Sequence, residues 1–275
     1  MSKPRNRFLP IEDRLPILAG EGWRATLREA VEGLMGLTEV RRRADRLAER
    51  VAEGEETFKA FLDIMEIELD GKGVADAIPS KGPVVMIANH PHGGAEPLAL
   101  TTLALRARPD VKVFGNVEVQ ALAGIEKWLL PLEILGEGAA RKNLSVMKQA
   151  LNHLRGGGLL AVFPAGAVSH WQRETGRVED PPWPPHTARI VNKSGASVLP
   201  VRFFGQNGPL FQALGMIHPL LRSALIPRAF LAMRGRTVRC RAGMVLNRSD
   251  LPRDPEEINI ALRRAVYGVF PGDGN

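Results

Sequence analysis

The sequence is short of cysteine and of aromatic residues, and each shortage excludes a class of protein. Cys240 is the only cysteine, so no disulfide can form within this sequence and a reducing compartment is expected. It alternates with arginines in the stretch 238–242, a pattern typical of a strand with one apolar face, which predicts a buried structural thiol. One tyrosine and 5% aromatic residues leave little for base stacking, so nucleic acid is not the expected partner.

Long apolar runs are also missing. The longest uncharged run, residues 156–172, is broken by glycines, a proline and polar residues and is no candidate for a membrane span. Residues 1–15 are basic but lack the apolar region of a signal peptide. We therefore expect a cytoplasmic protein that is peripheral on the inner face of the cell membrane.

What the sequence has in excess is positive charge. Lys and Arg number 37 against 30 Asp and Glu, which gives a net charge of +7. A basic surface attracts an acidic partner, such as anionic lipid headgroups, an acidic carrier protein, a phosphorylated substrate or nucleic acid. Because the aromatic content argues against nucleic acid, an anionic membrane surface is favoured.

The order of apolar patterns predicts an α/β protein. Residues 22–70 carry apolar side chains at helical spacing, which predicts helices that pack on a core or, alternatively, lie on a membrane. From Pro83 onward, patterns of buried strands alternate with helical ones. The expected strands are 83–88, 111–114, 159–163 and 197–204, and the expected helices are 97–106, 142–154 and one from near Thr187. We expect an N-terminal helical segment (1–70) packed on the core and a second domain (71–275) with a central, mostly parallel sheet flanked by helices.

A polar cluster directly follows the strand expected at 83–88. Chemistry in α/β proteins gathers on the loops beyond the carboxyl ends of strands, which is where His90 and Glu96 stand. Pro97 suits the first position of the following helix, so Glu96 lies near the helix start, where the dipole favours a carboxylate. The sequence therefore predicts that the two side chains meet.

The two glycines between His90 and Glu96 let the loop turn back on itself. Glu96 can then orient the imidazole as a general base, while N–H groups of Gly93 and Gly94 face a developing oxyanion. Alternatively, the pair only caps and packs the helix start. His90 and His92 are spaced as two metal ligands, but the further ligands expected nearby are missing, so no metal is expected.

Three motifs follow one another in the sequence, and their order and separations together indicate a protein family. They are Asn89-His90 with Glu96, Phe163-Pro164-Ala165-Gly166, and Val198-Leu199-Pro200-Val201. At these separations they resemble the glycerophospholipid (lysophospholipid) acyltransferase superfamily, and more closely a hemolysin-labelled bacterial branch that includes lyso-ornithine lipid acyltransferases. The resemblance runs from about residue 66 to residue 245 and includes the stretches 180–183 and 208–212. It implies a glycerol-3-phosphate acyltransferase-like fold for residues 71–275.

The resemblance also implies an activity. A fatty-acyl group would move from a thioester of acyl carrier protein or CoA to the hydroxyl of a lysolipid, either a lyso-ornithine-type aminolipid or lysophosphatidate. His90 would be the general base and Glu96 would orient it, with no metal or organic cofactor. An acidic donor suits the basic surface. The expected substrate-binding residues are Asn89, Gly93, Gly94, Arg141, Lys142, Phe163, Pro164, Gly166 and Ser169, with the hydroxyl of Ser169 stabilising its loop.

The sequence departs from the superfamily pattern in two places. Five residues separate His90 from its acid, and the acid is Glu, where the common pattern has four residues and Asp. Ala165 and Val168 occupy the positions of a Glu and an Arg that contact the phosphate region of the acceptor in the superfamily. The acceptor is then an amino-acid lipid, or phosphate binding rests on Arg141 and Lys142, which are equally expected as solvated helix charges.

The stretch 210–233 mixes large apolar residues with Arg222 and Arg228. This pattern predicts core packing, an acyl groove or a surface that contacts a membrane. Two other functions remain open beside the acyltransferase. One is a non-catalytic membrane-binding or membrane-perturbing protein, as the hemolysin label suggests, and the other is a hydrolase that passes the acyl group to water.

Overall fold

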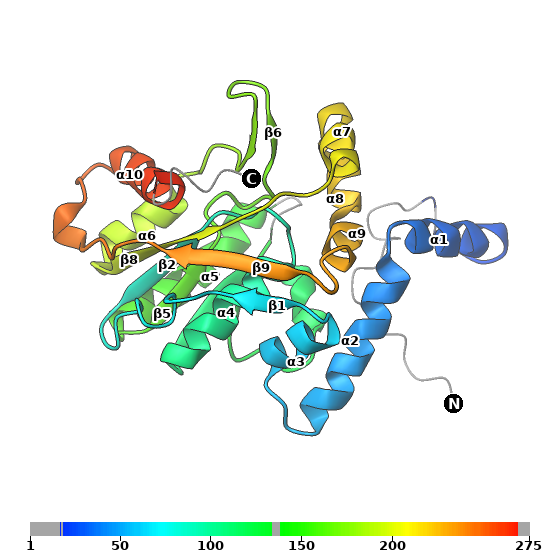
Figure 1. Ribbon diagram of the computed structural model, residues 1–275, viewed down its shortest axis with the longest axis horizontal. Coiled ribbons are helices and arrows are strands. Elements are labelled where there is room, and N and C mark those ends of the chain that lie inside the picture. The colour runs from blue at the N-terminus through cyan, green and yellow to red at the C-terminus, as the bar shows by residue number, and fades with distance from the viewer. Residues whose placement is uncertain (1–16, 18, 134–137, 269–275) are drawn as a thin grey trace.

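A seven-stranded sheet lies between two layers of helices in the computed structural model, which describes residues 17, 19–133 and 138–268 (Figure 1). The order of the strands across the sheet is β1-β9-β8-β2-β5-β3-β4. The five strands from β8 to β4 are parallel, β9 is antiparallel to β8, and β1 is parallel to β9. The predicted mostly parallel α/β fold is confirmed.

The strands follow the apolar runs of the sequence closely. Their bounds are β1 (Glu68–Asp70), β2 (Val84–Ala88), β3 (Val111–Asn116), β4 (Leu129–Leu132), β5 (Leu159–Val162), β8 (Ser197–Phe203) and β9 (Thr237–Ala242). A separate antiparallel hairpin is formed by β6 (His170–Gln172) and β7 (Arg177–Glu179). Cys240 on β9 is fully buried, and burial raises the pKa of its thiol to about 12. The predicted structural thiol is confirmed.

Each face of the sheet has its own apolar core, because successive side chains of a strand point to opposite faces. On β2, Val84 and Met86 join one core and Val85 and Ile87 join the other. The first core is covered by α2 (Leu37–Ala52), α3 (Thr57–Ile64) and α4 (Ala95–Ala107), and the second by α5 (Ala139–Arg155), α6 (His186–Ser194) and α10 (Pro255–Gly268).

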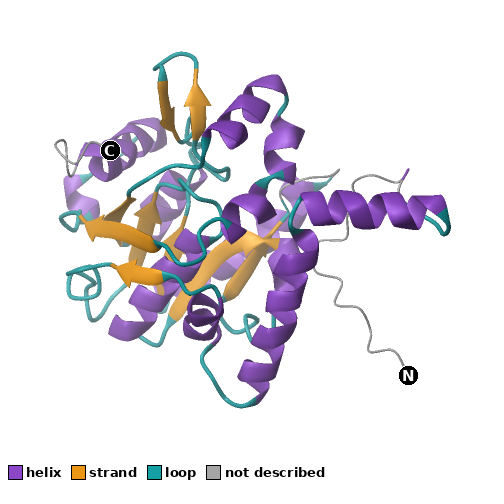
Figure 2. Ribbon diagram, turned by 45° about the vertical axis from the view of Figure 1, so that its right-hand side comes forward, coloured by secondary structure: helices purple, strands orange, loops and turns teal. Residues whose placement is uncertain are grey.

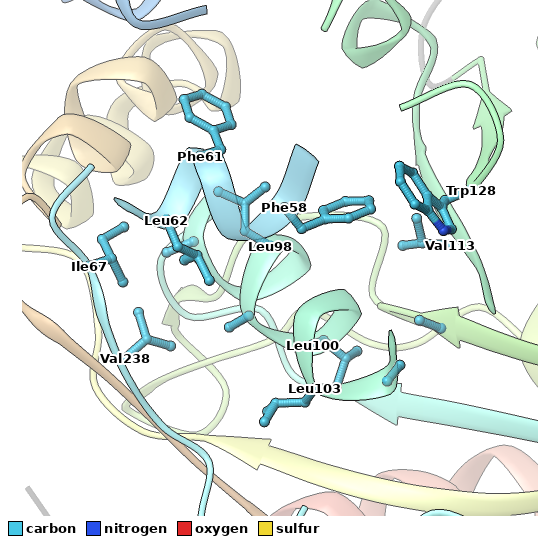
Figure 3. Packing of buried hydrophobic residues seen from close by; sticks show 14 of the residues in the cluster. Phe58, Phe61, Leu62, Ile67, Leu98, Leu100, Leu103, Val113, Trp128 and Val238 are labelled. Carbon is cyan, nitrogen blue, oxygen red and sulfur yellow. The ribbon is translucent and has the colours of Figure 1, made fainter. Parts of the chain in front are cut away.

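The first core is densely aromatic at one end. Figure 3 shows Phe58 of α3 facing Trp128, and their ring centroids lie 5.2 Å apart in an edge-to-face arrangement. Leu98, Leu100 and Leu103 of α4 lie between α3 and the sheet in the same view. α3 is thus fixed on α4, the helix that begins at the polar loop after β2.

The N-terminal helices differ from the prediction in two respects. α2 and α3 pack on the core as expected, but α1 (Trp23–Leu34) stands clear of the sheet, with Trp23 66% and Leu34 69% exposed (Figures 1 and 2). The helical pattern expected through residue 70 ends at Ile64, and residues 68–70 form the edge strand β1. Glu66, with φ 54°, turns the chain, and β9 supplies the hydrogen-bonding partner for β1.

Three short helices follow β8 and rise beside the hairpin β6–β7 (Figure 1). They are α7 (Pro209–Ile217), α8 (Pro219–Ala224) and α9 (Ile226–Leu231), and two 3-10 turns, η3 (Val117–Ala121) and η4 (Arg248–Asp250), complete the described elements. The N–H of Trp171 on β6 donates to Gln212 Oε1 on α7 at 3.0 Å. Among the described residues, no helix is long and apolar enough to cross a bilayer.

Candidate active site

The loop between β2 and α4 carries the polar cluster that the sequence singles out. All five residues of β2 are buried, and the strand delivers Asn89 and His90 to the carboxyl edge of the sheet. α4 begins at Ala95 with Gly94 as its N-cap, two residues earlier than predicted, which places Glu96 in the first turn. Its carboxylate therefore lies where the helix dipole favours negative charge.

Glu96 is completely buried, and its Oε1 atom contacts three other residues of the loop. This oxygen accepts hydrogen bonds from the N–H groups of His92 and of Gly93, the latter at 3.4 Å. It lies 3.7 Å from His90 Nδ1, within range of a charge interaction but longer than a hydrogen bond. One loop of six residues, from the end of β2 to the start of α4, thus brings the two side chains together.

The ionisation of Glu96 follows from two opposed effects. Burial raises the pKa of this carboxyl, but the facing imidazoles of His90 and His92 and the N–H of His92 outweigh it, and the net pKa lies below the ordinary value. Neither Glu96 Oε2 nor His90 Nδ1 has a hydrogen-bond partner among the described residues. Both atoms are buried, and a small movement that shortens the 3.7 Å separation of Nδ1 and Oε1 would give the imidazole its hydrogen bond.

The imidazole of His90 rests on the ring of Phe163, with the centroids 4.7 Å apart. Phe163 follows β5, the neighbour of β2, so the two predicted motifs meet at one edge of the sheet. The side chain of His90 keeps 14% of its exposure. With Nδ1 facing Glu96, Nε2 is the ring nitrogen on the side away from the carboxylate.

The main chain of His90 is held on both sides by residues about 80 to 90 positions away. Its N–H donates to Asp180 Oδ1 at 3.1 Å, and its C=O accepts from the N–H of Ser169 at 2.8 Å. The hydroxyl of Ser169 donates to the same Asp180 oxygen, and Trp183 Nε1 donates to the other at 2.9 Å. The sequence does not identify Asp180 as a residue of this site, although the stretch 180–183 is part of the resemblance to the superfamily.

Asn89 serves the fold more than the substrate. Its side-chain Nδ2 donates to the C=O of Phe203 at 2.9 Å, and its Oδ1 accepts from the N–H of Phe203 at 2.7 Å. Asn89 is buried and ties the end of β2 to the end of β8. Both polar atoms of its amide are thus bonded to main chain.

The two loop glycines are both required, for different reasons. Gly93 has φ +98°, a region that disfavours side chains, and its N–H points to Glu96 rather than to a substrate position. Gly94 has an ordinary φ, but an added Cβ would lie 2.6 Å from a ring carbon of Phe230 on α9. The short helices after β8 therefore pack directly on the candidate catalytic loop.

The block after β5 makes a tight turn beside His90. Gly166 has φ +62°, and its N–H donates to the C=O of Phe163 at 3.1 Å across Pro164. Ala165 and Val168 are buried, so no charged side chain occupies the positions of the superfamily's acceptor-binding pair. The side chain of Ser169 is buried and engaged with Asp180, in line with the expected role in stabilising the loop.

Arg141 and Lys142 lie farther from the pair than the other expected site residues. They open α5 beyond β4, at the same edge of the sheet but three strands away from β2. Arg141 is exposed, and Lys142 Nζ lies 3.5 Å from a carboxylate oxygen of Glu133. Two open surface hollows, which share Glu56, Lys127 and Trp128, lie near the amino ends of the strands and away from His90.

Comparison with known proteins agrees with the motifs. Over 165 residues the chain is 26% identical to the lyso-glycine lipid O-acyltransferase of Bacteroides thetaiotaomicron, a match that spans 60% of this chain and 58% of that protein. The resemblance to the superfamily that the sequence predicted is thereby confirmed. Over 169 residues the chain is 24% identical to the lyso-glycine lipid O-acyltransferase of Phocaeicola vulgatus, spanning 60% of the chain and 57% of the relative. The chain thus covers less than two thirds of the length of these relatives.

No protein-family model matches the chain. Among solved structures, PlsC of Thermotoga maritima, a 1-acyl-sn-glycerophosphate acyltransferase, aligns over 90% of this chain and 99% of its own. The TM-score is 0.46 and the identity 16%, a likeness too loose to add to the motifs.

Proposed function

We propose that this protein is a lysolipid O-acyltransferase, a transferase of lipid biosynthesis and phospholipid metabolism. The observation that carries the proposal is the buried carboxylate of Glu96 held 3.7 Å from His90 Nδ1 at the carboxyl edge of the sheet. The superfamily relatives support it, since their names describe transfer of an acyl group to a lysolipid. The side chain of His90 is also 14% exposed, so the imidazole is not sealed in the core as packing of the helix start alone would require.

In the proposed reaction, His90 Nε2 takes the proton from the acceptor hydroxyl while Glu96 stabilises the resulting imidazolium. The alcohol oxygen attacks the carbonyl carbon of an acyl thioester and forms a tetrahedral oxyanion. Collapse breaks the C–S bond, the new ester leaves, and the thiolate takes the proton from His90. Every bond and proton is accounted for without a metal or an organic cofactor.

The proposed donor is a thioester of acyl carrier protein or of CoA, because either is anionic and the chain carries a net charge of +7. The proposed acceptor is an amino-acid lysolipid of the lyso-ornithine type. Two buried apolar residues, Ala165 and Val168, replace the superfamily's charged acceptor contacts, which makes lysophosphatidate the weaker candidate. Arg141 and Lys142 remain proposed contacts for an anionic group.

We also propose that the enzyme works on the cytoplasmic face of a membrane. Large apolar side chains are exposed on the helices beside the site, and we call them the apolar rim: Leu210, Met216, Ile217, Leu220 and Leu221. α1 adds Trp23, Leu27 and Leu34, which fits a role of the helical segment (1–70) at the membrane and of residues 71–275 in catalysis. An exposed apolar surface with a basic net charge suits anionic headgroups.

The test is acyl transfer by purified variants. His90→Ala and Glu96→Gln should both fold, and with an acyl thioester and a panel of lysolipids His90→Ala should show no transfer, because no base remains. Glu96→Gln should lose roughly 10²- to 10⁴-fold in rate, the usual contribution of such a partner. Thioester consumption and mass spectrometry of the lipid product are the measurements.

The outcomes separate the alternatives. Wild-type rates in His90→Ala would end the proposed mechanism. Release of free fatty acid without acylated lipid would identify a hydrolase. Binding to liposomes with no thioester consumed for any acceptor would favour the non-catalytic membrane protein, a function that the exposed apolar rim also suits.

A further inference from the structure

Asp180 is a fully buried carboxylate that no step of the proposed reaction uses. It lies after β7, in the proline-rich connection before α6, ninety positions from His90 along the chain. A buried carboxylate is costly unless donors satisfy it, so its surroundings are informative.

Three donors converge on its two oxygens. The N–H of His90 and the hydroxyl of Ser169 reach Oδ1, and Trp183 Nε1 reaches Oδ2. Burial is the largest effect and raises the pKa of Asp180 above its ordinary value, although these hydrogen bonds and the nearby His90 lower it. All three partners donate, so the ionised form satisfies each of them.

Asp180 and Ser169 together fix the peptide groups on both sides of the His90 Cα. Asp180 binds the N–H, the N–H of Ser169 binds the C=O, and the Ser169 hydroxyl joins the two residues. Glu96 acts on the ring alone, at 3.7 Å. We call these contacts of Asp180 and Ser169 with the main chain of His90 the backbone clamp. The clamp fixes the position of the His90 backbone, and Glu96 orients the imidazole ring.

The clamp is itself anchored to α10. The N–H of Asp180 donates to Tyr267 Oη at 2.9 Å, and its C=O accepts from Arg263 at 3.0 Å. Both partners lie on α10, which packs on the opposite face of the sheet from α4. The position of His90 therefore depends on the packing of α10 on the sheet as well as on its own loop.

We propose that Asp180 is a positioning residue for the acyl transfer, which holds His90 at the distance from the acceptor hydroxyl that proton transfer needs. This inference rests on the proposed function. Displacement of a general base by about 1 Å is enough to cost roughly a hundredfold in rate. Because Asp180 touches the histidine main chain and no substrate, its loss should affect turnover and leave acceptor binding unchanged.

The decisive variant is Asp180→Asn, which keeps the shape but turns an acceptor-only group into one that is partly a donor. We expect kcat to fall roughly ten- to a hundredfold with KM for the lysolipid within about twofold. Ser169→Ala removes one link of the clamp and should lower kcat less, by roughly threefold to tenfold. If Asp180→Asn does not fold, Ser169→Ala tests the same proposal.

The matched control is Asp110→Asn. Asp110 pairs with the buried Arg108 at the amino ends of the strands, so the same substitution loosens the fold far from His90. It should lower the melting temperature and leave kcat per folded molecule unchanged. A loss of kcat in Asp180→Asn that Asp110→Asn reproduces, or no loss at all, would overturn the inference.

Amide hydrogen exchange tests the clamp without any activity. The peptide containing His90 should exchange faster in Asp180→Asn than in wild type and at the wild-type rate in Asp110→Asn. If the wild type transfers no acyl group, the proposed function fails on that result alone. Unchanged exchange at His90 in Asp180→Asn would then overturn the clamp as well, and faster exchange would uphold it.

Discussion

Gly94 is a residue at which the addition of a single methyl group should be harmful. Gly94→Ala would place a methyl group 2.6 Å from the ring of Phe230, although the backbone conformation suits alanine. We expect a loss of about 1–3 kcal/mol in the free energy of unfolding, measured by urea denaturation, and reduced activity as the loop shifts. Gly33→Ala, which adds the same atom to a helix with open space around it, should be neutral or slightly stabilising.

A second substitution checks the cause. In Gly94→Ala/Phe230→Leu the clash is relieved, so the double variant should lose less stability than the sum of the two single losses. Strict additivity would show that the contact with Phe230 is not what makes Gly94 necessary.

Residues close in sequence were the ones that sequence could identify as a site. His90 and Glu96 share one loop, so their types, spacing and place after a strand were enough to predict that they meet. Asp180 stands ninety positions away, and only the pairing of strands and the packing of α10 bring it to His90. A buried aspartate in a proline-rich stretch carries no local signal of that contact.

At the scale of the element, α2 depends on one carboxylate near its start. Glu39 accepts from Arg42 and from Arg43, whose side chain is buried and also donates to the C=O of Ile64 on α3. The hydrogen bond from Arg42 is the main cause that lowers the pKa of Glu39 to about 2, against the opposing effect of burial. Its ionised form is therefore stabilised by folding.

The consequence is a pH-dependent contribution of Glu39. A lowered pKa stabilises the fold above pH 4.5, and this contribution is lost as the pH falls toward about 2. Glu39→Gln should lower the free energy of unfolding by about 1 kcal/mol at pH 7, since the site is partly exposed, and the gap to wild type should narrow below pH 4.5. Urea curves at pH 7, 5 and 3.5 test this. Glu49→Gln on the exposed side of α2 should stay within about 0.5 kcal/mol of wild type throughout.

The elements that sequence predicted best are those buried on both faces. β2 and β5 are continuous apolar runs, and β8 contains one from Val198 to Val201. A short apolar run between turns is typical of a strand buried on both faces of a sheet. β1 was missed because three residues at a sheet edge take their conformation from β9, which lies far away in the sequence. The sequence leaves open whether a core or a membrane covers the apolar stripe of α1, because the stripe looks the same in both cases.

For the whole molecule, charge and exposed apolar surface predict binding to anionic vesicles. Ile217→Asp/Leu220→Asp in the apolar rim should weaken binding at least about tenfold, because two largely exposed side chains would no longer enter the interface. Higher salt should weaken the binding of wild type, since a net charge of +7 contributes. Vesicle sedimentation measures both effects.

The control lies on another face of the protein. Ile260 is 61% exposed, similar to Leu220, and belongs to α10, a helix that lies away from α7 and α8 (Figure 1). Ile260→Asp should bind vesicles like wild type. Equal loss in both variants would mean that the apolar rim is not the membrane-facing surface.

The anchoring of Asp180 by Tyr267 and Arg263 has a consequence for the timing of biosynthesis. A ribosome translates α10 after every other described element, long after His90 and Glu96 have left the exit tunnel. A nascent chain that reaches only α9 already contains both partners of the pair but not the helix that secures the clamp around the imidazole. The proposed pair is therefore fully positioned only after α10 has been translated and has docked on the sheet.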